Sequence, residues 1–151
     1  MTTILTIVVL ITSGLLAGGM VLVAAALVPT FRALPSPSSV QLHQTIDGYI
    51  NRYITPDTGL TIVLSALLVA LSDGTTARVF VGIGGLLCVA VTVISVRSNV
   101  PINKTIGRWQ LDDLPADVSG VHRRWARSHF ARTLAGVLAL LSFAASAVSL
   151  G

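Results

Sequence analysis

The sequence VFVGIGGLLCVAVTVISV, residues 79–96, carries no charged side chain. A helix of about 18–20 apolar residues crosses the hydrocarbon core of a bilayer, so this stretch predicts a transmembrane span. Two other long apolar runs have the same character, residues 4–28 and 132–150. A fourth, residues 60–71, is too short alone and needs residues 53–59 to complete the crossing. The sequence therefore predicts an all-α, antiparallel bundle of four transmembrane helices.

Composition places the surface of this protein in lipid. Only 11% of the 151 residues are charged and 53% are hydrophobic, whereas soluble domains carry about 25% charged residues. The length suits one small domain, so residues 1–151 are expected to form a single integral membrane domain whose partner is the lipid bilayer. The lone cysteine, Cys88, lies inside an apolar run and is expected to pack within the bundle.

The basic residues indicate a topology. Nine of the ten Lys and Arg residues fall between the first and second spans or between the third and fourth, and only Arg78 falls on the other side. Because positive charge is enriched in cytoplasmic segments, loops 32–57 and 97–132 are predicted to be cytoplasmic and both termini outside, in the plasma (inner) membrane. The basic residues flank spans and accompany no nucleic-acid motif, so no nucleic-acid partner is expected.

Two local patterns refine this bundle. An apolar stripe at helical spacing between Val40 and Ile54 predicts an amphipathic cytoplasmic helix that leads into the second span. Gly14 and Gly18 lie four residues apart on the first span, a spacing that lets two helices approach closely. Such glycine-rich faces could join copies of the chain in a homo-oligomer, although glycine is also common in membrane helices generally.

Polar residues gather where the last two spans meet the cytoplasmic boundary. Asn99 and Asn103 flank Pro101 at the end of the third span. Hydrocarbon offers such groups no hydrogen-bond partner, and polar residues at membrane depth commonly serve a function. Each could instead cap or anchor a helix end, but their gathering at one depth predicts a site. At the start of the fourth span, residues at three- or four-residue steps share one helix face: His122, Trp125, His129, Arg132 and Thr133.

Two motifs in this region carry a family resemblance. N-V-P-x-N at residues 99–103 is followed after a loop by W-x-x-x-H-x-x-R-T at residues 125–133. Together they resemble the anthrone-oxygenase-like family of small membrane proteins with four helices, and the resemblance is specific over residues 97–136. It implies a membrane-embedded oxygenase that oxidises a lipophilic aromatic, polyketide-like substrate of the anthrone type with O2.

The residues of the two motifs suit this chemistry. An anthrone that loses a carbon-bound proton becomes an enolate, which can reduce oxygen without a cofactor. His129 is the candidate base, because imidazole titrates near neutral pH. Trp125 is expected to stack on the substrate rings, and Thr133 is the second candidate for substrate binding. The candidate donors to the enolate oxygen are Arg132, Asn99 and Asn103.

Other functions stay open at this point. A metal-dependent oxidase would use His43 and Asp47, which have the spacing of ligands on one helix face, with His129 or His122 completing the set. Oxygen chemistry would favour iron or copper, but His43 and Asp47 could equally form a surface pair. A small transporter or a structural membrane subunit are the non-enzymatic alternatives.

Overall fold

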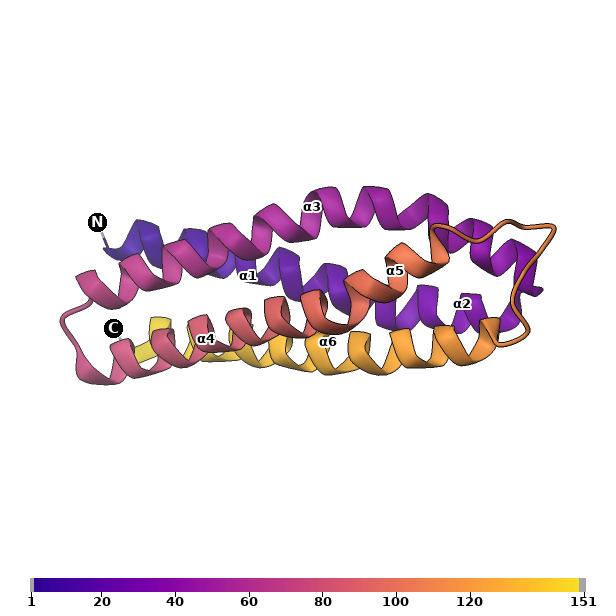
Figure 1. Cartoon of the computed structure of the whole chain (residues 1–151). Coiled ribbons are helices and arrows are strands. Elements are labelled where there is room, and N and C mark those ends of the chain that lie inside the picture. The colour runs from indigo at the N-terminus through magenta and orange to yellow at the C-terminus, as the bar shows by residue number, and fades with distance from the viewer. Residues whose placement is uncertain (1, 150–151) are drawn as a thin grey trace.

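The computed structural model describes residues 2–149, which form a bundle of four long helical segments (Figure 1). Each segment is long and apolar enough to cross a membrane, so the predicted fold class is confirmed and the chain is that of an integral membrane protein. Along the chain the elements are α1 (Thr2–Leu22), η1 (Val23–Leu27), α2 (Val28–Ala33), α3 (Ser36–Leu71), α4 (Thr75–Ile94), η2 (Ser95–Asn99), α5 (Val100–Ile106) and α6 (Val118–Ser149).

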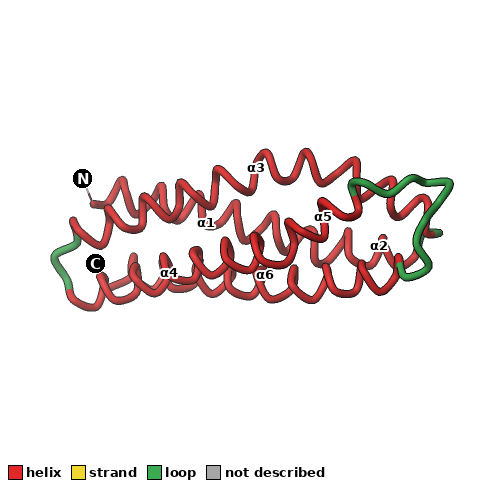
Figure 2. The backbone as a smooth tube through the Cα atoms, in the orientation of Figure 1, coloured by secondary structure: helices red, strands yellow, loops and turns green. Residues whose placement is uncertain are grey.

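The four segments pack as a square of antiparallel neighbours. The α1 helix packs against α3 and α6, and α4 packs against the same two helices. A short connection, residues 72–74, lies at one end of the bundle beside the first and last described residues. The other end holds residues 34–35 and the long loop 107–117 (Figure 2).

The outside of the bundle is apolar and the inside contains small polar side chains. Leu86 is 71% exposed and Val63 is 65% exposed, whereas Thr61 and Ser146 are fully buried. The buried hydroxyls bond to helix carbonyls; for example, Ser142 Oγ donates to the Phe80 carbonyl oxygen at 2.7 Å. Small polar residues inside and large apolar residues outside are typical of helices packed in lipid.

Glycines allow the tightest helix contacts within the bundle. The ring of Phe143 lies over Gly84, where a Cβ atom would meet ring carbons at 2.5–2.8 Å. Similarly, Gly136 admits the side chain of Met20. A Cβ atom added at Gly14 or Gly18, in contrast, would meet no atom of another helix within 4 Å. The face that carries these two glycines is therefore unused within the chain, and the homo-oligomer stays a prediction.

The helices extend further than the predicted spans. The amphipathic segment and the second span form one helix, α3, with Pro56 in its interior. The segments predicted as loops, 32–57 and 97–132, are therefore mostly helical, and only residues 34–35 and 107–117 connect them. A segment of 32 residues is about 48 Å long, roughly 18 Å longer than a hydrocarbon core. Nine of the ten basic residues lie at or beyond one end of the apolar runs, so we expect the excess at that end.

The first and third segments contain the same local distortion. In each, a five-residue π-helical turn, η1 or η2, precedes a Val-Pro pair. The amide of Val28 donates to the carbonyl of Val23, and that of Val100 donates to the carbonyl of Ser95. Proline has no N–H and crowds the carbonyl four residues before it, so the wider turn accommodates the ring. The second distortion positions both asparagines of the N-V-P-x-N motif.

Candidate functional site

The polar face of α6 points into the bundle at its basic end. His129 is fully buried, and Trp125 and Arg132 are 6% and 7% exposed. The imidazole of His129 bonds through Nε2 to the carbonyl oxygen of Met20 on α1, at 3.0 Å. A carbonyl only accepts, so Nε2 carries the hydrogen of this imidazole. Its Nδ1 then accepts hydrogen bonds from the Arg132 guanidinium, through Nε at 3.1 Å and Nη2 at 2.9 Å.

Arg132 also bonds across to the π-helical turn of the third segment. Its Nη1 donates to Ser95 Oγ at 3.1 Å, and Ser95 in turn donates to the carbonyl of Val91 at 2.7 Å. A guanidinium has five N–H groups, and these contacts use three of them. Arg132 is therefore fixed in orientation and still has donors to offer a ligand.

The two asparagines make different contacts. Asn99 is buried and its Nδ2 donates to the Trp125 carbonyl at 3.3 Å, while its Oδ1 has no partner. Asn103 joins α5 to α3, because its Nδ2 donates to Asp47 Oδ1 and its Oδ1 lies 3.3 Å from His43 Nε2. Asn51 Nδ2 donates to the same oxygen of Asp47 at 2.7 Å.

Aromatic rings fill the space beside these polar groups. The rings of Phe31, His43 and His122 stack in near-parallel planes with centroids 5.1–5.3 Å apart. Trp125 meets His43 edge-on, at 5.0 Å between centroids, and stacks on His129 at 5.1 Å. The cluster brings together side chains from α2, α3 and α6, so it exists only in the folded bundle.

Several buried polar atoms in this cluster or beside it have no hydrogen-bond partner. They are His43 Nδ1, His122 Nε2, Trp125 Nε1 and Asn99 Oδ1. A buried polar atom without a partner costs about 1–3 kcal/mol, and most buried polar atoms in proteins are paired. Four such atoms lie in or beside one group of side chains, so this part of the bundle has unused hydrogen-bonding capacity.

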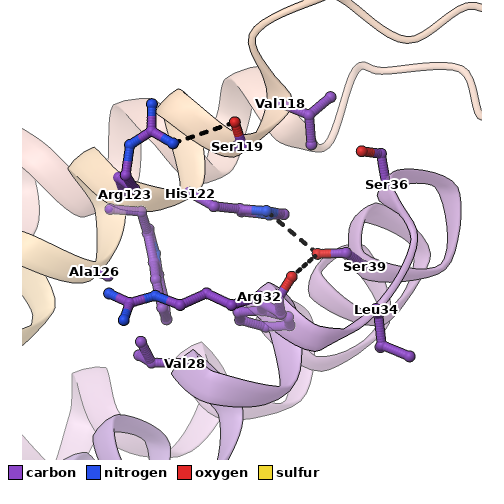
Figure 3. Close-up of a pocket in the computed structure, with 12 residues that line it drawn as sticks. Val28, Arg32, Leu34, Ser36, Ser39, Val118, Ser119, His122, Arg123 and Ala126 are labelled. Carbon is purple, nitrogen blue, oxygen red and sulfur yellow. Dashed lines mark hydrogen bonds between the residues drawn. The ribbon is translucent and has the colours of Figure 1, made fainter.

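Three cavities surround the cluster. The largest, about 590 Å³, lies at the basic end between α2, α3 and α6. Figure 3 shows it with His122 bonded to Ser39. A second, about 310 Å³, lies between α3 and the third segment, and it is lined mostly by apolar and small side chains with Asn99, Asn103 and Arg132. A hollow of about 20 Å³ lies next to both, because it shares Trp125 with the first and Arg132 with the second.

The predicted site residues do not all reach these cavities. Arg132, Asn99, Asn103 and Trp125 line at least one of the three. His129 and Thr133 are absent from the walls of all three, and Thr133 Oγ1 donates to the carbonyl of its own helix at residue 129, 2.8 Å away. The roles assigned to these residues stay predictions.

The predicted metal ligands are held apart by other groups. Asp47 reaches His43 only through the amide of Asn103, and the nitrogens of His129 face Met20 and Arg132. In residues 2–149, no three or more His, Cys, Asp or Glu side chains form a group that could hold a metal ion. The iron or copper site stays a prediction, which elemental analysis of the purified protein tests.

Sequence reasoning missed three residues that belong to the aromatic cluster or bond to the polar groups beside it. Phe31 belongs to an apolar run, Ser39 to a serine-rich turn, and Ser95 to the third span, so none of them stood out. Ser39 Oγ donates to the Phe31 carbonyl at 3.0 Å and lies 3.3 Å from His122 Nδ1. A signal did exist for Phe31. Residues 28–29 repeat the Val-Pro pair of residues 100–101, so Phe31 occupies the position that corresponds to Asn103.

Comparison with known proteins gives one match. The family model described as anthrone oxygenase matches residues 48–142, which is more than half of the chain and includes both sequence motifs. Phe31, Ser39 and His43 lie before the matched segment. No curated protein and no solved structure gives a significant match. The match bears out the resemblance seen in the motifs, and the chain belongs to the anthrone oxygenase family.

Proposed function

We propose that this protein is a membrane-embedded oxygenase that oxidises a lipophilic, anthrone-type aromatic substrate with O2. The overall reaction converts an activated CH2 group and O2 into a C=O group and water. The observation that carries the proposal is the cavity of about 310 Å³, which combines apolar walls with Arg132, Asn99 and Asn103. Family membership supports an oxygenase-like role.

The position of this cavity suits a substrate that arrives from the bilayer. Thr55 and Gly59 of α3 and Val96 of η2 line it, and all three are exposed on the outside of the bundle. A flat apolar molecule partitions into lipid, since burying apolar surface is favourable by roughly 25 cal/mol per Å². It could then enter between α3 and the third segment without crossing water.

The chemistry needs a group to remove a carbon-bound proton and a donor for the resulting oxyanion. Arg132 is the proposed oxyanion donor, because it lines the cavity and keeps unused N–H groups. Asn99 and Asn103 are proposed to help place the substrate, and Trp125 is proposed as an aromatic wall. The proton acceptor is proposed to be one of the buried imidazoles, His129 being the one predicted from the sequence.

Oxygen consumption tests this function directly. The purified protein in lipid nanodiscs is expected to take up one O2 per anthrone oxidised and to form the corresponding quinone. An anthrone variant alkylated twice at the reacting carbon is the control, because it has no proton to lose there. Quinone formation no faster than in empty nanodiscs would refute the oxygenase. The transporter and the structural subunit would then remain. Substrate flux in proteoliposomes would support the transporter, and a stably co-purifying partner protein would support the subunit.

A further inference from the structure

Two buried imidazoles, those of His129 and His43, differ in whether a ring nitrogen has a lone pair that no hydrogen bond uses. His129 has none: Nε2 donates to the Met20 carbonyl, and Nδ1 accepts from two nitrogens of Arg132. It is fully buried and lines none of the three cavities. While Arg132 holds this position, His129 has no lone pair to offer a substrate.

His43 presents the opposite case. The orientation of the Asn103 amide is fixed, because its Nδ2 donates to the carboxylate of Asp47, which only accepts. The Asn103 Oδ1 atom therefore faces His43 Nε2 at 3.3 Å, and Nε2 must carry the hydrogen. The lone pair is then on His43 Nδ1, which is buried and has no partner. The chain Asp47–Asn103–His43 thus holds the imidazole in one tautomer with a free basic nitrogen.

The location of His43 matches this chemistry. It lines the small hollow together with Arg132 and Trp125. The hollow, about 20 Å³, has room for one water-sized group. Asn103, Asn51 and Arg132 line both the hollow and the cavity of about 310 Å³. A substrate whose body occupies the larger cavity would present one edge between His43 and Arg132.

We propose that His43 Nδ1 accepts the carbon-bound proton of the substrate, and that His129 is a positioning residue that holds Arg132. This inference rests on the proposed oxygenase function. The C–H bond breaks, its proton binds Nδ1, and its electron pair stays on the substrate as an enolate whose oxygen faces Arg132. Molecular oxygen then oxidises the enolate carbon to a peroxide that takes up the proton from His43. This returns the neutral imidazole. The hydroperoxide then loses its remaining carbon-bound proton together with the outer OH group as water, which leaves the carbonyl group.

Deuterium exchange without oxygen isolates the proton-transfer step. The protein in nanodiscs is incubated in D2O with an anthrone under argon, and deuterium at the reacting carbon is followed by mass spectrometry. The wild-type protein is expected to exchange this position faster than empty nanodiscs. A positioned base contributes about 10²–10⁴-fold, so His43→Gln is expected to lose at least about 100-fold of the exchange rate. Tyr49→Phe, a change at a 71% exposed residue on the same helix, is the control and should exchange like wild type.

Two further measurements separate a base from a structural residue. Imidazole added to His43→Ala is expected to restore part of the exchange, which a merely misfolded variant would not show. His129→Gln is expected to keep exchange within about tenfold of wild type and to lower kcat for aerobic turnover by a similar factor with little change in KM, because Arg132 loses a hydrogen-bond partner that fixes its position. Exchange that survives in His43→Gln and disappears in His129→Gln would overturn the assignment. A wild-type protein that neither exchanges the substrate nor consumes O2 would overturn the proposed function, and this inference with it.

Discussion

Arg132 is a buried cation without a carboxylate partner in contact. In the part of the chain that the structure describes, the one ion pair joins Arg124 and Asp117 on the surface. Burying a cation is costly unless its charge is used or compensated, and the bonds of Arg132 go to the neutral groups of His129 and Ser95. Such an arrangement is ready to receive an anion, which the enolate of the proposed reaction would supply.

Replacing Arg132 by glutamine should therefore remove mainly transition-state stabilisation. The loss of one oxyanion donor typically costs about 10²–10³ in kcat, and we expect a decrease of this size in kcat/KM for anthrone oxidation, measured with an oxygen electrode. Arg127→Gln, at an exposed position of the same helix, should leave the rate unchanged. Equal rates for Arg132→Gln and the wild type would exclude the oxyanion role.

Trp125 offers a second test at the scale of one residue. Its ring meets His43 edge-on and borders the hollow. Aromatic pairs contribute about 0.5–1.5 kcal/mol beyond the area they bury, so Trp125→Leu is expected to raise KM by roughly 2- to 10-fold. Trp125→Phe should keep most of the affinity. A Leu variant with the KM of wild type, at unchanged protein stability, would show that the ring is not a substrate wall.

At the residue scale the sequence predicts which side chains share a face of one helix, but not which side chains meet between helices. The common face of Trp125, His129 and Arg132 follows from the period of one helix. The bridge from Asn103 to His43 and Asp47 does not, because it depends on how α3 is rotated against α5. That rotation is fixed by contacts such as Gln44, whose Nε2 donates to the carbonyls of Ile106 and Trp109 at 2.9 and 3.0 Å.

At the scale of elements, the π-helical turn before Pro101 determines where Asn99 and Asn103 point. Without it the third segment would continue as a regular helix, and residues 100–106 would rotate by up to about 100° relative to α4. π-Helical turns of this kind are frequent at functional sites. The turn is therefore the structural reason why the amides reach Trp125 and the Asp47–His43 pair.

Pro101→Ala tests this role of the turn. Alanine restores an N–H group and removes the ring that crowds the preceding turn, so the regular helix becomes accessible and Asn103 leaves its partners. We expect a loss of at least about tenfold in turnover, since misplacement by about 1 Å can cost 10²-fold, with little change in thermal stability. Pro37→Ala, at an exposed position in the first turn of α3, is the control. Full turnover in Pro101→Ala would show that the proline is not needed for the turn or that the turn is not needed for activity.

The elements themselves were largely predictable and their ends were not. Long apolar runs identify helices in lipid because every backbone polar group must be paired within the helix. A proline in a helix interior commonly breaks or kinks the helix, yet α3 continues through Pro56. The ring removes one backbone hydrogen bond, to the carbonyl of Arg52 four residues earlier. The helix nevertheless continues on both sides of the proline, which the local sequence did not indicate.

At the scale of the whole molecule, the bundle divides into an apolar part and a basic end that extends beyond it. The cavity of about 310 Å³ lies near the junction of the two, and the cavity of about 590 Å³ lies towards the basic end. A site at this junction could receive a substrate from lipid and release water to the aqueous side. The proposed reaction needs both, because its substrate is apolar and its second product is water.

The proposed orientation, with the basic end in the cytoplasm, has a direct test. Cys88 is the only cysteine and is buried, so a Cys88→Ala background allows one cysteine to be introduced at a time. Asp73→Cys lies in the connection at the end of the first and last residues, and Asp112→Cys lies in the loop at the basic end; both positions are exposed. An impermeant maleimide added to sealed right-side-out vesicles is expected to label Asp73→Cys at once and Asp112→Cys only after permeabilisation, because positive charge is retained on the cytoplasmic side. The reverse labelling pattern would place the basic end, and with it the site, on the outer face of the membrane.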